Sequence, residues 1–256
     1  MNTPAEIAKN YVGIGKGKVN TPPLKLFILG IMAGIFIGIG GIAYEMATAT
    51  IGGALGKLVG ACMFPAGLAL VLIAGSELFT GNCLMVMALL ERRITPAQLL
   101  RNWLTVYLGN AVGGAAVAAL AVYSHTASLF GDGLARSMVS IAESKAALGF
   151  GDAFLRGVLC NFLVCLAVWM AAASKRAEGK VIALFFPILL FVLCGYEHCI
   201  ANLYYLPAGA FAAAEYGMET TLTLAGCLEN LAAVTLGNLV GGAALGVGYR
   251  FAYLKE

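Results

Sequence analysis

The sequence predicts an all-α integral membrane protein with six transmembrane helices, two of them interrupted. Of the 256 residues, 61% are hydrophobic and only 11% are charged, whereas a soluble domain of this size carries about 25% charged residues. The mean hydropathy is +0.88. Six apolar regions are long enough to cross a hydrocarbon core of about 30 Å, which takes about 20 helical residues.

Four of these regions have the length of a single crossing: about Leu24–Ala47, Leu99–Tyr123, Ala153–Ala173 and Leu222–Tyr249. The other two, Leu58–Leu90 and Val181–Phe211, exceed 30 residues. At about 1.5 Å per residue, each would extend well beyond the bilayer as one straight helix. We expect both to break in the middle, within a single transmembrane channel domain that spans residues 1–256.

The positive charges predict the orientation. Of the 16 Lys and Arg residues, a cytoplasmic N-terminus leaves only four outside: Lys57, Arg136, Lys145 and Arg156. Positively charged residues concentrate on the cytoplasmic side. The sequence therefore predicts a multi-pass protein of the plasma (cell inner) membrane with both termini in the cytoplasm. Residues 1–23 would form a cytoplasmic segment, and His125–Asp152 a long polar loop outside.

Two motifs recur in the two halves of the chain. Gly75–Asn82 and Gly195–Asn202 both read G-x-E-x-x-x-x-N, and each lies inside one of the two overlong regions. Asn102–Ala115 matches Asn230–Ala243 with the shared letters N-x-x-x-V-x-L-G-N-x-V-G-G-A. Three crossings in each half make the halves insert in opposite directions. This order predicts a 3+3 inverted repeat, in which two broken helices mark the substrate path.

The breaks favour an anion as substrate. A helix that restarts in mid-membrane presents the positive end of its dipole, and backbone N–H groups at such an end bind anions. The Thr80 hydroxyl can add a further donor. Glu77 and Glu197 would repel an anion, so we expect them to support the loops by accepting hydrogen bonds from backbone N–H groups.

His198 is the residue most suited to chemistry. The chain has two histidines, and the other, His125, lies in the predicted outer loop. His198 sits at the second break, where the first motif has Leu78. An imidazole can donate a hydrogen bond to an anion or pass it a proton near neutral pH. The alternative is a structural histidine whose hydrogen bonds are satisfied within the protein.

Other classes of site have little support in the sequence. The seven cysteines lie in apolar segments and form no C-x-x-C pair, so we interpret them as small buried side chains and expect no metal and no disulfide framework. We expect no cofactor. No basic run is interleaved with aromatic residues, which argues against nucleic acid as a partner.

Three segments resemble known signatures. Leu72–Gly81 resembles the first signature of the formate/nitrite transporter family, and Gly157–Ala167 fits the second, G-x-x-[CA]-N-x-x-V-C-L-A, without a mismatch. Glu197–Asn202 is similar to the family's histidine loop. The resemblance covers essentially the whole chain.

The resemblance implies an aquaporin-like protomer in the lipid bilayer that assembles as a homopentamer, with one pore in each protomer. The substrates it implies are small anions of weak acids, such as formate, nitrite and hydrosulfide, that move with protons. We favour formate because Glu197-His198-Cys199 looks closer to the formate branch. A nitrite or hydrosulfide channel is the alternative.

The resemblance also implies roles for single residues. Thr80 and His198 would face the substrate at the centre of the pore, and Asn161 and Asn238 would support that site by hydrogen bonding. Lys145 would draw anions toward the pore. The apolar constrictions on either side of the histidine would be formed by Phe64, Leu68, Phe79 and Phe191.

Three other classes of function fit less well. An aquaporin-like channel for neutral solutes needs paired N-P-A loops and a pore arginine, and the sequence has neither motif. A membrane-embedded enzyme needs clustered catalytic groups, so we do not expect an enzyme. A purely structural pentamer leaves the glutamates and the histidine at the breaks without a purpose.

Overall fold

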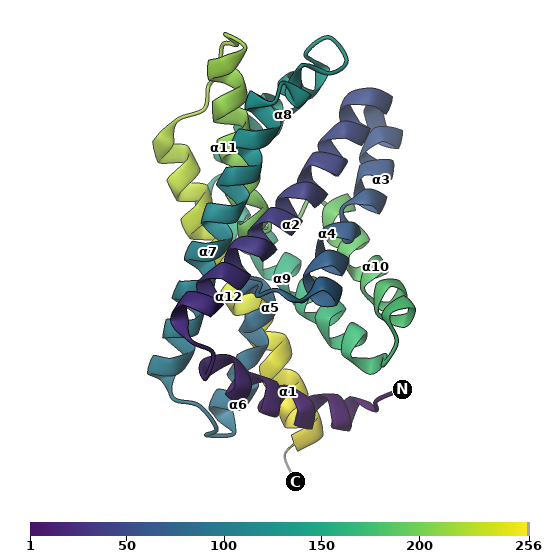
Figure 1. The fold of residues 1–256 in the computed structure, drawn as a ribbon, viewed down its shortest axis with the longest axis vertical. Helices are drawn as coiled ribbons and strands as arrows, with labels where there is room; N and C mark the ends of the chain where they lie inside the picture. Colours follow the sequence, from purple (N-terminus) through teal and green to yellow (C-terminus); the bar gives the residue numbers. More distant parts are fainter. Residues whose placement is uncertain (255–256) are drawn as a thin grey trace.

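The computed structural model describes residues 1–254, which contain helices and no strand (Figure 1). In chain order the helices and helical turns are α1 (Pro4–Val19), α2 (Pro23–Ile51), α3 (Gly53–Met63), α4 (Pro65–Leu70), η1 (Val71–Gly75), α5 (Phe79–Asn82), η2 (Cys83–Met85), α6 (Val86–Leu90), α7 (Pro96–Tyr123), η3 (Thr126–Ser128), α8 (Gly133–Ala146), α9 (Phe150–Ala173), α10 (Ala177–Leu193), α11 (Cys199–Glu215) and α12 (Leu224–Leu254). Helix α1 packs beside the end of α12 at the lower end of Figure 1.

Five helical segments are long and apolar enough to cross a membrane: Pro23–Ile51, Gly53–Gly75, Pro96–Tyr123, Phe150–Ala173 and Leu224–Leu254. The chain is therefore an all-α, multi-pass membrane protein, as its composition predicts. The remaining predicted region consists of α10 and α11, which have 17 residues each. Each of these two helices is about 26 Å long, somewhat less than the hydrocarbon thickness.

Two pairs of long helices form the frame of the fold: α2 packs along α7, and α9 packs along α12. Glycines lie where the helices approach most closely. A Cβ atom on Gly113 would lie 2.1 Å from the Ile31 carbonyl oxygen, and one on Gly241 would lie 2.0 Å from that of Val158. Small residues at helix contacts allow close packing, which replaces the hydrophobic driving force that lipid does not supply.

Both G-x-E motifs interrupt helical structure, as the length of their regions predicts. Gly75 (φ +87°) and Gly195 (φ +68°) adopt backbone angles that only glycine tolerates without strain. The chain then runs extended through Leu78 and His198. Helices α5 and α11 begin at the next residue, so each break leaves a short stretch of backbone without helical hydrogen bonds.

One expectation is wrong: His125–Asp152 is not simply a loop, because α8 occupies the middle of it. Leu134, Met138 and Ala142 of this helix are fully buried, and α8 packs against α11. These residues recur every four positions and so share one face of the helix. Polar and charged residues on the other face conceal this pattern in the sequence.

Replacing Gly241 with Ala is expected to destabilise the protein. The added methyl group would overlap the Val158 carbonyl, so α9 and α12 would have to separate, at a cost of about 1–3 kcal/mol. Thermal unfolding in detergent should show a lower Tm. Gly248→Ala on the same helix is the control, because no atom lies within 4 Å of its Cβ position. Equal Tm values for the two variants would contradict this account of the packing.

Candidate functional site

An asparagine of α7 pairs the free backbone groups of the first break. Asn110 Oδ1 accepts a hydrogen bond from the Phe79 N–H (3.0 Å), and Asn110 Nδ2 donates to the carbonyls of Gly30 (2.7 Å) and Glu77 (2.9 Å). An unpaired peptide group inside the bilayer costs several kcal/mol. Asn110 therefore removes most of the penalty that the break would otherwise carry.

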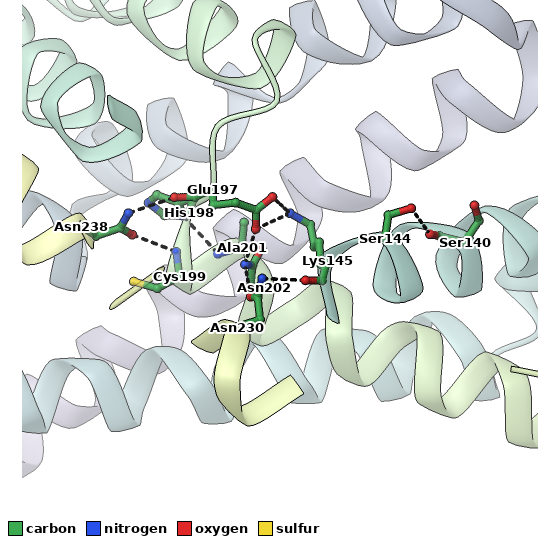
Figure 2. A network of polar contacts seen from close by, with 10 residues as sticks. All are labelled: Ser140, Ser144, Lys145, Glu197, His198, Cys199, Ala201, Asn202, Asn230 and Asn238. Atoms are coloured by element: carbon green, nitrogen blue, oxygen red, sulfur yellow. Dashed lines mark hydrogen bonds and ion pairs between the residues drawn. The ribbon is translucent and has the colours of Figure 1, made fainter. Parts of the chain in front are cut away.

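An asparagine of α12 does the same at the second break (Figure 2). Asn238 Oδ1 accepts from the Cys199 N–H (2.9 Å), and Asn238 Nδ2 donates to the carbonyls of Gly157 (2.8 Å) and Glu197 (2.9 Å). Sequence reasoning predicted a supporting role for Asn238 but missed Asn110. The available signal was the long repeat, in which the two asparagines are aligned.

Glu77, in the first break, is surrounded by polar side chains from α1, α5 and α7. Its Oε2 lies 2.6 Å from Lys18 Nζ and accepts a hydrogen bond from Asn82 Nδ2 (2.8 Å), which also donates to Asn102 Oδ1 (2.9 Å). Lys18 and Asn102 were not singled out from the sequence. The lysine is 59 positions from its partner, and only the fold shows that α1 reaches the break.

Glu197 has a matching environment in the second half (Figure 2). Its two oxygens lie 2.9 and 3.1 Å from Lys145 Nζ. Asn202 Nδ2 donates to the carboxylate (2.7 Å) and to Asn230 Oδ1 (2.8 Å). The expectation that both glutamates accept backbone N–H groups is wrong. Their partners are ammonium and amide side chains, which a buried carboxylate needs to offset the loss of water.

The loop before α12 is tied to the helix that carries Lys145. Glu143 Oε1 accepts hydrogen bonds from the Thr221 N–H (2.7 Å) and the Thr220 hydroxyl (2.9 Å). These bonds hold the pKa of the exposed Glu143 carboxyl below its usual value. The contact fixes the end of α8, and with it the base of the Lys145 side chain.

The two halves of the chain meet at Thr80 and His198. Thr80 Oγ1 lies 2.9 Å from His198 Nε2, and both residues are buried. Asn161 of α9 donates from Nδ2 to the carbonyl of Thr80 (3.2 Å) and to that of Asn238 (2.7 Å). The structure thus brings four of the predicted site residues into one hydrogen-bonded group.

The hydrogen bonds determine which nitrogen of His198 carries the proton. His198 Nδ1 accepts a hydrogen bond from the backbone N–H of Ala201 (3.1 Å), at the start of α11, where the histidine acts as N-cap. A nitrogen that accepts from an N–H cannot itself carry a proton. In the neutral ring the proton is therefore on Nε2, which donates to Thr80 Oγ1. The hydrogen of the Thr80 hydroxyl then remains available to another acceptor.

A cavity lies on each side of this pair. The chamber beside the second break, named the outer chamber after the predicted orientation, has a volume of about 110 Å³ and is lined by residues that include Lys145, Glu197 and His198. The chamber beside the first break, named the inner chamber in the same way, has a volume of about 190 Å³ and is lined by residues that include Lys18 and Asn82. Each chamber therefore has one lysine in its wall, and the ammonium group of that lysine is paired with the glutamate of the nearby break.

Aromatic side chains narrow the outer chamber next to the histidine. Phe64 and Phe191 both line it, and their rings meet edge-to-face with centroids 5.6 Å apart. Phe191 also stacks on the His198 ring at 5.8 Å. These positions are compatible with the constriction that the resemblance implies.

On the inner side, one predicted constriction residue lies elsewhere. Leu68 lines the inner chamber, but Phe79 packs edge-on against the rings of Trp103 and Tyr107, at 6.3 and 5.1 Å. Phe79 lines an apolar cavity between α7 and α12 and is not among the residues that line the two chambers, so its role in a constriction stays a prediction. Because alternate side chains of an extended segment point in opposite directions, Leu78 lines the inner chamber instead.

Within residues 1–254, no group of three or more His, Cys, Asp or Glu side chains could hold a metal ion. The seven cysteines are free. The polar chemistry of the site thus rests on the lysines, glutamates and asparagines of the two breaks, together with Thr80 and His198.

Comparisons with known proteins identify the family of the chain. Residues 5–252 match the family model described as "Formate/nitrite transporter". The chain is 38% identical to the "Probable formate transporter" of Methanothermobacter thermautotrophicus over 100% of this chain and 98% of the relative. It is 36% identical to "Formate channel FocA" of Escherichia coli (strain K12), covering 99% of this chain and 95% of FocA.

Solved structures give the same result. A structure titled "FNT family ion channel" superposes with a TM-score of 0.84 at 33% identity, over 96% of both chains. A second, titled "Pentameric formate channel with formate bound", superposes with a TM-score of 0.80 at 34% identity, over 91% of this chain and 98% of that one. These relatives are channels and transporters, in agreement with the prediction that the chain is not an enzyme. With the family model matching nearly its whole length, the chain belongs to the formate/nitrite transporter family.

Proposed function

We propose that this protein is a channel for small monovalent anions of weak acids, with formate as the preferred substrate, and that the anion's charge is neutralised between the two chambers. The buried Thr80–His198 pair, with a lysine-lined chamber on each side, is the observation that carries the proposal. The names of the relatives, which include formate channels, support formate over nitrite and hydrosulfide.

The proposed assembly is a homopentamer of six-crossing protomers in the plasma membrane, with both termini in the cytoplasm. In each protomer the segment from α3 to α6 would form the second crossing, and α10 with α11 the fifth. The matching roles of Asn110 and Asn238 support the 3+3 inverted repeat. The pentameric structural relative supports the assembly.

The lysines concentrate the anion in the chambers. Lys145 and Lys18 each pair with a glutamate, and the ammonium groups line the chambers. Asn82 and Asn202 also donate hydrogen bonds to the two carboxylates, which partly offset their negative charge. In walls of low dielectric such an ammonium attracts anions more strongly than it would in water.

The centre of the protein then selects the neutral form of the substrate. Phe64, Phe191 and Leu68 present apolar surface to the two chambers. An isolated anion loses many kcal/mol of solvation against such surface, while the neutral acid loses far less. A weak conjugate base can take up a proton from water on the side of entry, cross as the acid and return the proton to water on the far side, whereas chloride stays ionised.

His198 serves this crossing as a fixed hydrogen-bond donor. Because its Nδ1 is occupied by the Ala201 N–H, the ring directs Nε2–H at Thr80, and the threonine hydroxyl can donate in turn to the substrate. The arrangement needs no proton to leave the ring. A protonated ring would place an Nδ1–H against the Ala201 N–H and lose the cap of α11.

Replacing His198 with Phe should lower formate flux into proteoliposomes by roughly 10- to 100-fold, because a hydrogen bond to a charged or polar substrate contributes about 1.5–3 kcal/mol. His198→Asn should retain part of the flux. Asparagine is a good N-cap, so its oxygen can accept from Ala201 and keep the start of α11 in place, but its shorter amide group does not reach Thr80. The measurement is the initial rate of formate uptake against pH.

His125→Asn, remote from the site, is the control and should leave uptake unchanged. Full flux in His198→Phe would remove the histidine from the mechanism. A pH dependence that disappears in His198→Asn while part of the flux remains would instead show that the ring itself transfers the proton.

The proposal also predicts selectivity. In proteoliposomes with a more acidic exterior, formate should accumulate about tenfold for each unit of pH difference, because only the neutral acid equilibrates. Nitrite and hydrosulfide should also accumulate in response to the pH difference, each to its own extent. Chloride uptake should not respond to the pH difference. Chloride uptake as fast as that of formate would contradict the proposal, and rapid uptake of glycerol would favour a channel for neutral solutes.

A further inference from the structure

Glu45 is a carboxyl group that the proposed transport path does not use. It lies on α2 and is completely buried. Its Oε2 accepts a hydrogen bond from the Tyr204 hydroxyl (2.5 Å), and its Oε1 has no hydrogen-bond partner among residues 1–254. Buried carboxylates are normally paired with a cation or with several donors.

The surroundings of Glu45 contain no compensating cation. Glu45 takes part in no ion pair among the described residues. Two tyrosine rings connect Glu45 to the nearest cation. The rings of Tyr204 and Tyr205 pack edge-on with centroids 5.3 Å apart, and the Lys145 ammonium lies 5.1 Å from the centroid of Tyr205. That ammonium is already bound to Glu197.

The helices packed against this part of α2 present mainly small or apolar groups. Gly60 of α3 approaches Tyr44, and Gly56 of the same helix approaches Thr48. Gly67 of α4 approaches Gly40. Val117 of α7 approaches Gly38. On α8, Ser137 reaches Thr48 (3.3 Å). The titratable or charged groups near Glu45 are thus Tyr44 on its own helix, Tyr204 and Tyr205 on α11, and Lys145 on α8.

The same groups connect Glu45 to the outer chamber. Tyr44, the residue before Glu45, lines that chamber, as do Tyr205 and Lys145. A charge on Glu45 would therefore act on the chamber through two tyrosine rings of low dielectric, with little screening by water.

We propose that Glu45 is a proton-binding site in the wall of the outer chamber: it is a neutral carboxylic acid near neutral pH, and loss of its proton lowers the chamber's attraction for anions. This inference rests on the proposed function. A neutral carboxyl needs no cation and tolerates one unpaired oxygen at far lower cost than a carboxylate does. An ionised Glu45 would oppose Lys145 and repel the anion that Lys145 attracts.

The first test reads the carboxyl directly. Infrared spectra of the full protein in lipid should contain a protonated-carboxyl band near neutral pH that is absent from Glu45→Gln and present in Glu219→Gln. Glu219 is an exposed glutamate, so this control makes the same substitution at a carboxyl group in contact with water. Absence of any band that Glu45→Gln abolishes would overturn the proposal. This result does not depend on which anion crosses, so it is separate from a failure of the proposed function.

The second test measures formate exchange in proteoliposomes with equal pH on both sides. The ratio of Glu45→Gln flux to wild-type flux should be close to one on the acidic side of neutrality. It should rise on the order of tenfold at alkaline pH, because glutamine never acquires the negative charge. Glu219→Gln should give a ratio near one throughout. A ratio for Glu45→Gln that stays at one, even with lowered stability, would show a purely structural role and overturn the proposal.

Tyr204→Phe is the second variant, for use if Glu45→Gln does not fold. It removes the one hydrogen bond that the carboxyl receives within the described part of the chain and so disfavours the ionised form. Its flux should begin to fall at a higher pH than that of the wild type, and the infrared band should persist to a higher pH. An alkaline profile identical to that of the wild type would contradict the proposal.

Discussion

The peptide groups at the two helix breaks are the constraint on which the structure depends. A backbone in the bilayer can leave the helix only where other groups take up its hydrogen bonds. Asn110 and Asn238 do so at the two breaks, each with one accepted and two donated bonds. Both reach the breaks because glycines let α7 and α12 lie directly against α2 and α9. Packing and polar chemistry are therefore parts of one arrangement.

The centre of the site departs from the symmetry of this frame. The first break has Leu78 where the second has His198, and the histidine reaches across to Thr80 in the other half. One imidazole thus connects the two halves of the chain. The lysine–glutamate pairs of the two breaks match, but the chambers beside them differ in volume and lining.

Much of the fold follows from the sequence because its signals are local or repeated. Hydropathy and length predict the long helices, and the overlong regions predict the breaks at Gly75 and Gly195. Prediction from the sequence fails where contacts between distant segments determine the position of a residue or a helix. The place of Lys18 depends on how α1 folds back, and the apolar face of α8 is concealed among its charges. The resemblance implies that Phe79 forms a constriction, and only the fold shows that its ring packs against Trp103 and Tyr107.

The candidate site likewise contains residues that the sequence predicts and residues that only the fold reveals. Thr80, His198, Asn161 and Asn238 were predicted, and the structure places them together. Asn110 could have been found from its alignment with Asn238. Glu45 lies in a single apolar region without a repeat, and only the positions of Tyr204 and Lys145 in the fold show that its charge would matter.

The protonation state of the His198 ring distinguishes a fixed hydrogen-bond donor from a group that transfers a proton. In a His125→Asn protein, which leaves one imidazole in the chain, nitrogen NMR in lipid bilayers reports which ring nitrogen carries the proton. If His198 is a fixed hydrogen-bond donor, its ring is neutral and carries the proton on Nε2 throughout the pH range in which formate is transported. A proton on Nδ1, or a doubly protonated ring under those conditions, would contradict this role.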